Sequence, residues 1–82
     1  MITPSQIRGA RAMLNLTQAE LAARAGISTT GLNNIERGVS DPKASTLSAI
    51  QRVLEEAGVE FTNGTEPGVK LKSKGRKRRS SS

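Results

Sequence analysis

The chain has 82 residues, enough for one small domain, and it contains neither Cys nor His. Without these residue types the usual thiol nucleophile, general base and soft metal ligands are missing, so we expect no enzyme, no metal and no other cofactor. No apolar run approaches the roughly 20 residues of a membrane span. The N-terminus lacks the basic and then apolar pattern of a signal peptide. We therefore expect a cytoplasmic protein with no membrane partner.

The net charge of +6 is unevenly distributed along the chain. Residues 70–82 contain seven of the thirteen Lys and Arg residues and no acid, whereas residues 1–69 contain six bases and all seven acids. The basic character therefore belongs to the C-terminal segment, and the fold has to be inferred from patterns. Residues 73–82 consist only of Ser, Gly, Lys and Arg, which cannot bury a core, so they are predicted to form a disordered basic tail.

Two short helices are predicted at the start of the chain. Thr3-Pro4-Ser5-Gln6 is a capping box with proline at the first helical position, and apolar residues then recur at helical spacing until Asn15. A second capping box, Thr17-Gln18-Ala19-Glu20, precedes a helix that ends at Gly26, where a left-handed residue is needed. Short helices joined by tight turns predict a compact helical domain.

A third and a fourth helix complete the predicted helical part. Ser28 caps the third helix, which ends at Gly38 after the buried stripe of Leu32 and Ile35. The fourth helix is predicted from about residue 45 to residue 57, with Gly58 as its C-cap. Its inward positions are Leu47, Ile50, Val53 and Leu54.

The pattern changes period after residue 58. Residues 59–62 and 68–72 alternate between apolar and polar, and the turn residues 63–67 separate them, which predicts a β-hairpin. Its apolar face either packs on the helices of the same chain or forms a dimer interface; its members are Val59, Phe61, Val69 and Leu71. The predicted fold is mainly α: a compact four-helix domain in residues 1–58, a hairpin in residues 59–72 and a basic tail in residues 73–82.

The second and third helices carry the functional signal. Ala22 lies four residues before Gly26, where two helices must cross closely and only a small side chain fits. The positions of the third helix that do not face the core are all polar, and such a helix can lie in a DNA major groove with its first residues at base edges. Taken alone, polar positions of this kind are more often a solvated face. They are Thr29, Thr30, Asn33, Asn34 and Arg37.

Several spaced segments resemble one known family. Leu16-Thr-Gln-Ala-Glu-Leu-Ala22, Ala25-Gly-Ile-Ser28 and Ile35-Glu-Arg-Gly38, followed by Pro42 and Thr46-Leu47, are similar to the phage repressor and Cro-type (lambda-repressor-like) helix-turn-helix family of small bacterial and phage transcriptional regulators. The resemblance covers about residues 5–58 and implies a four-helix Cro/repressor-type domain that binds double-stranded DNA. The hairpin is similar to the C-terminal extension of some short single-domain bacterial regulators.

The resemblance assigns roles to individual residues. The base-reading positions of the family match Thr29, Thr30 and Asn34, and an Asn amide can hydrogen-bond adenine while a Thr methyl contacts thymine. Arg11 and Glu36 match the positions of an interior ion pair. The phosphate contact of the family matches Gln18. Further candidates for phosphate contacts are Ser28, Asn33, Arg37, Lys43 and Arg8.

Two segments depart from the family pattern. Gly31 lies inside the base-reading helix and should cost roughly 1 kcal/mol relative to Ala. The loop from Val39 to Asp41 lacks the bases that some relatives use on phosphates, and Asp41 would repel DNA that it faced.

The resemblance implies a sequence-specific transcriptional regulator. Its simplest form is a repressor that binds a near-palindromic operator as a homodimer and becomes nucleoid-associated when bound. The two protomers are expected to join at the hairpin, either by pairing of its free edge or by packing of its apolar face. RNA polymerase or a regulatory protein is a further possible partner. Two alternatives remain open: an antitoxin that represses its own operon, and a protein-interaction antiactivator that uses the apolar hairpin. The basic tail is either a sequence-independent DNA arm or a solubilising tail.

Overall fold

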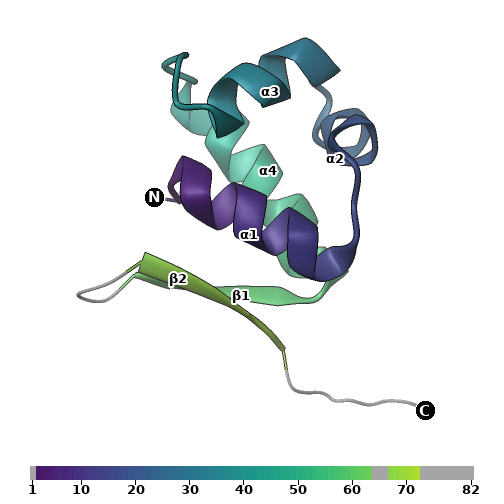
Figure 1. Ribbon diagram of the computed structural model, residues 1–82, viewed down its shortest axis with the longest axis vertical. Helices are drawn as coiled ribbons and strands as arrows, with labels where there is room; N and C mark the ends of the chain where they lie inside the picture. Colours follow the sequence, from purple (N-terminus) through teal and green to yellow (C-terminus); the bar gives the residue numbers. More distant parts are fainter. Residues whose placement is uncertain (1, 64–66, 73–82) are drawn as a thin grey trace.

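The computed structural model describes residues 2–63 and 67–72, which form four helices followed by a two-stranded antiparallel sheet (Figure 1). The elements are α1 (Pro4–Leu14), α2 (Gln18–Ala25), α3 (Thr29–Glu36), α4 (Ala44–Ala57), β1 (Val59–Asn63) and β2 (Pro67–Leu71). The mainly helical fold with a C-terminal hairpin that the sequence predicts is confirmed. The predicted disordered tail at residues 73–82 lies outside the described residues.

The predicted helix caps are present in the structure. The Thr3 hydroxyl accepts from the Gln6 backbone N–H at 3.2 Å, and the Gln6 side chain accepts from the Thr3 backbone N–H at 2.8 Å. Thr17 and Glu20 repeat this reciprocal arrangement at the start of α2. Because each cap satisfies donors that the first helical turn leaves unpaired, the caps define where the helices begin.

The second capping box gives the fold a pH-dependent contribution. The hydrogen bond that the Thr17 backbone N–H donates to the Glu20 carboxylate, supported by the Thr17 side chain, lowers the pKa of Glu20 below its ordinary value. A carboxylate whose pKa is lowered on folding contributes stability that is complete above its unfolded-state pKa. That stability is lost as the pH falls through the folded-state pKa. We therefore expect Glu20→Gln, which keeps an acceptor without a charge, to lose less stability than wild type across this acidic window.

Urea titrations of both proteins at several pH values between neutrality and the lowered pKa of Glu20 measure this difference. Glu56→Gln, on the exposed side of α4, is the matched control and should follow wild type. A difference in unfolding free energy between Glu20→Gln and wild type that stays constant with pH would contradict the expectation.

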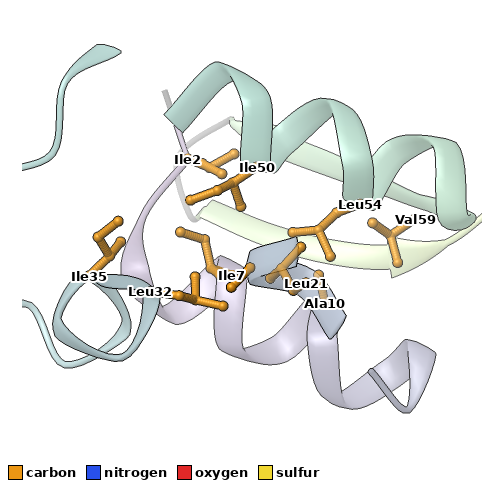
Figure 2. Close-up of a cluster of buried hydrophobic side chains, with 10 residues drawn as sticks. Ile2, Ile7, Ala10, Leu21, Leu32, Ile35, Ile50, Leu54 and Val59 are labelled. Atoms are coloured by element: carbon orange, nitrogen blue, oxygen red, sulfur yellow. The ribbon is translucent and has the colours of Figure 1, made fainter. Parts of the chain in front are cut away.

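The hydrophobic core lies between the helices and the hairpin (Figure 2). Figure 2 shows side chains from α1, α2, α3 and α4 converging with one side chain from β1. Those with the largest volumes that are fully buried are Ile7, Leu21, Leu32, Ile50, Leu54 and Val59. The hairpin therefore contributes to the same core as the helices.

None of the helices in the described residues is long and apolar enough to cross a membrane.

The packing of the hairpin corrects one expectation. Val59 pairs with Leu71 and Phe61 with Val69, so the four side chains share one face as predicted. Val59 has no exposed surface, and Phe61 and Val69 are partly buried against the core. Val59 therefore cannot belong to a dimer interface, because its side chain is enclosed by its own chain. Only Leu71, which is 56% exposed, leaves most of its side chain free for a partner.

Two residues of α1 hold the hairpin in place. The buried Gln6 side chain donates from Nε2 to the Thr62 carbonyl at 3.2 Å and to the Gly68 carbonyl at 2.8 Å. Gly9 lies so close to β2 that a Cβ there would stand 3.2 Å from Val69 Cγ1. Figure 1 shows the hairpin on one side of α1 and α3 on the other. The hairpin is therefore a fixed element on the side of the domain away from α3.

Candidate nucleic-acid interface

The turn between α2 and α3 fixes the direction of α3. Gly26 adopts the left-handed conformation at φ 75°, and the Ile27 backbone N–H donates to the Ala22 carbonyl at 2.9 Å. Ala22 is buried, as the sequence predicts for a close helix crossing. Leu32 and Ile35 anchor the inner side of α3 in the core. The remaining side of α3 is thus held rigidly at the surface.

The three predicted base-reading residues lie on this side of α3 but differ in exposure. Thr29 and Thr30 are exposed in the first turn, directly after the Ser28 cap, whose hydroxyl accepts from the Gly31 N–H at 2.9 Å. Asn34 lies one turn after Thr30 on the same face and is half-buried. It borders a pocket of about 240 Å³ between α3 and the loop before α4, lined by Ile27, Gly31, Asn34, Ile35, Ser40, Asp41, Pro42 and Thr46.

Arg11 and Glu36, which match the ion-pair positions of the family, lie together in the structure. Arg11 Nε is 2.9 Å from Glu36 Oε2, and Arg11 Nη2 donates to Glu36 Oε1 at 3.0 Å. Arg11 Nη1 also donates to the Leu16 carbonyl at 3.1 Å. The Glu36 side chain is only 3% exposed, so the pair ties α1 to the inner side of α3.

Gln18 is the first residue of α2, and its side chain joins α2 to α3 as part of the same network. Its Nε2 donates to Asn33 Oδ1 at 3.2 Å and to Glu36 Oε1 at 3.1 Å. This pairing was not predicted from the sequence, which treats Gln18 and Asn33 as separate phosphate contacts. No sequence pattern indicates this hydrogen bond, because the two residues are 15 positions apart and lie on different helices.

The remaining candidate phosphate contacts surround α3. Arg37 is exposed at the C-terminal end of α3, and Lys43 is exposed at the start of α4. The Arg8 guanidinium donates to the Glu36 backbone carbonyl and to Ser5 Oγ, the latter at 3.2 Å, so part of its donor capacity is used within the domain. The Ser28 hydroxyl is occupied as a helix cap, although its residue is exposed. The exposed cations Arg37 and Lys43 therefore both lie in the segment that joins the C-terminal end of α3 to α4.

Known proteins share this arrangement. A Helix-turn-helix family model matches residues 7–61, from α1 into β1. An uncharacterized HTH-type transcriptional regulator of Sinorhizobium fredii, y4dL, is 36% identical over 50 residues, which are 61% of this chain and 26% of that protein. The chain thus spans about a quarter of the length of this curated relative.

A solved structure extends the similarity to the fold. The solution structure of the DNA-binding domain of the P22 C2 repressor matches with a TM-score of 0.62 at 27% sequence identity, and the match covers 67% of this chain and 72% of that one. The family model includes the complete α2–turn–α3 unit, the whole of α4 and α1 from residue 7 onward. The chain belongs to the Helix-turn-helix family, and its fold is similar to that of a repressor DNA-binding domain.

Proposed function

We propose that this protein is a transcriptional repressor that binds a near-palindromic operator as a homodimer, with α3 in the major groove. The observation that carries the proposal is the exposure of Thr29 and Thr30 at the N-terminus of α3, a helix that Leu32 and Ile35 anchor in the core. The major groove admits an α-helix, and its base edges can be distinguished by hydroxyl, methyl and amide groups. Occupation of a promoter by such a domain blocks transcription.

Groups that can donate to phosphates flank the proposed reading helix. Arg37 directly follows α3, Lys43 directly precedes α4, and both residues are exposed. Asn33 and Arg8 lie on the side of α3 that faces α1 and α2. Contacts to the DNA backbone position a domain on the duplex without reading sequence, so these side chains would set the register in which α3 meets the bases.

The homodimer is proposed from the hairpin edge. Among the described residues, β1 and β2 pair only with each other, so each strand has one unpaired edge. An unpaired edge is a template for pairing with another strand. The exposed Leu71 lies at the end of β2 and would add apolar contact there. The antiactivator alternative loses support, because most of the apolar face that it requires is packed on the helices.

The experiment that tests the proposal is selection of bound duplexes from a random DNA pool, followed by sedimentation of the protein with the selected duplex. We expect an enriched sequence with two-fold symmetry and two protomers per duplex. A transcription assay from a promoter containing that sequence should then show repression. Absence of any enriched sequence would overturn sequence-specific binding, and a monomer on an asymmetric site would overturn the homodimer.

Asn34→Ala is expected to weaken binding to the selected operator by about 1–3 kcal/mol and to relax preference at one base pair per half-site. Binding to random DNA should be almost unchanged, because backbone contacts carry that affinity. Titrations against the operator and single-base variants measure the effect. Arg37→Ala is the comparator, and it should weaken all sequences alike and reduce the salt slope by about 0.9. An equal loss for every sequence in Asn34→Ala would make Asn34 a positioning residue.

A further inference from the structure

A buried carboxylate begins a hydrogen-bond chain that reaches the surface between α2 and α3. The Glu36 carboxylate accepts from Arg11 Nε and Nη2 and from Gln18 Nε2. An ionised carboxylate can only accept hydrogen bonds. The Gln18 amide must therefore turn its amino group, and not its carbonyl oxygen, toward Glu36. The ion pair thus fixes the orientation of an amide on a different helix.

This orientation is passed on to Asn33. An amide amino group has two hydrogens, and Gln18 gives one to Glu36 at 3.1 Å and one to Asn33 Oδ1 at 3.2 Å. The Gln18 side chain then has only its acceptor oxygen left, which a phosphate oxygen would repel. Because Gln18 presents an N–H, Asn33 must present its carbonyl, and its own amino group points away from Gln18. Among the described residues, that amino group of Asn33 has no acceptor.

We propose that Asn33, and not Gln18, is the amide that donates to the DNA backbone, and that Gln18 is a positioning residue that acts through it. The inference rests on the proposed function, since it requires α3 to lie in the groove. In a docked helix-turn-helix unit the first helix of the motif crosses the backbone. Asn33 lies on the side of α3 that faces α2, as its contact with Gln18 shows. Its amino group therefore meets a phosphate and not a base edge.

The assignment has a distinctive signature. A neutral donor strengthens binding to every sequence equally, because the phosphate carries no sequence information. It releases no counterion, so its loss leaves the salt slope unchanged, in contrast to the loss of Lys or Arg. The pre-set orientation also means that removal of Gln18 frees the Asn33 amide to rotate. Gln18 then affects affinity only while Asn33 is present.

A double-mutant cycle of Gln18→Ala and Asn33→Ala tests the proposal on a random-sequence duplex and on the selected operator, at a temperature where all variants are folded by circular dichroism. We expect Asn33→Ala to weaken both duplexes about three- to tenfold with an unchanged salt slope. The double variant should bind no more weakly than Asn33→Ala alone. Gln51→Ala is the matched control, because its amide donates to Glu55 on α4, and it should bind as wild type.

Three outcomes would overturn the proposal. Losses from Gln18→Ala and Asn33→Ala that multiply in the double variant would mean that Gln18 contacts phosphate independently. A loss in Asn33→Ala confined to particular base pairs would make Asn33 a base-reading residue. Unchanged affinity in Asn33→Ala would remove it from the interface.

Side-chain amide exchange in the free wild-type protein tests the orientation without any substitution. The Gln18 amide protons should exchange slowly and the Asn33 amide protons quickly, and addition of a random duplex should shift and protect those of Asn33. Slow exchange at Asn33 and fast exchange at Gln18 would contradict the proposed orientations of the two side-chain amides. If no preferred sequence is found in the selection experiment, the proposed repressor function fails, while these measurements on random DNA still decide the role of Asn33.

Discussion

Arg11→Met is expected to lower the free energy of unfolding by about 3–5 kcal/mol, because it leaves the Glu36 carboxylate buried without its cation. The Glu36 side chain is 3% exposed and receives two hydrogen bonds from Arg11. Small domains have total stabilities of about 5–15 kcal/mol, so this loss should unfold much of the protein near physiological temperature. Urea denaturation followed by circular dichroism measures it. A urea midpoint equal to that of wild type would show that loss of Arg11 does not destabilise the buried Glu36 carboxylate.

Two further variants identify the cause of the loss. Arg52→Met removes a charge from the exposed side of α4, where Arg52 has no hydrogen bond or ion pair among the described residues, and it should change stability by less than about 0.5 kcal/mol. Adding Glu36→Leu to Arg11→Met removes the stranded charge and should restore part of the stability, since an apolar pair can replace a buried ion pair. Glu36→Leu alone is measured for comparison. A loss of stability in the double variant equal to the sum of the losses in Arg11→Met and Glu36→Leu would point to lost packing instead.

Substitutions in the cross-strand pair of Val59 and Leu71 distinguish two roles of the hairpin, packing in the core and the proposed dimerisation. Val59→Ala is expected to lower the free energy of unfolding by about 2–3 kcal/mol, because it removes two methyl groups from a site with no exposed surface. Leu71→Ala, at a position 56% exposed, should change the stability of the monomer by less than about 0.5 kcal/mol. The opposite burial of two directly paired residues makes each the control for the other.

Sedimentation over a concentration series completes this comparison. If the edge of the hairpin is the dimer interface, Leu71→Ala should weaken self-association while its thermal midpoint at low concentration stays at the wild-type value. A Leu71→Ala protein that associates as wild type does would remove Leu71 from the interface. A Val59→Ala protein as stable as wild type would contradict the place of the hairpin in the core.

The helices were predictable because their signals are local. Thr3 and Thr17 cap helices through backbone groups three residues away, and Gly26 allows the left-handed turn by itself. The apolar positions of α4 also recur at helical spacing, and they predict a start one residue from the observed Ala44. Such features depend on short-range hydrogen bonds and on periodicity, and both can be read from neighbouring letters. The positions of Thr29 and Thr30 on an exposed helix face follow from the same reasoning.

The tertiary structure alone decided which long-range partners these residues meet. The sequence predicts only a capping role for Gln6, yet its side-chain amino group also donates to two carbonyls of the hairpin, 56 and 62 residues further along the chain. The apolar face of the hairpin fits both a dimer interface and packing on the helices of the same chain. Only the tertiary structure shows that Val59 belongs to the core of its own chain. Gln18 and Asn33 each looked like an independent polar contact until the buried carboxylate of Glu36 fixed the orientation of both. Hydrogen-bond direction and burial depend on atoms brought together by the fold, and a linear pattern records only which groups are available.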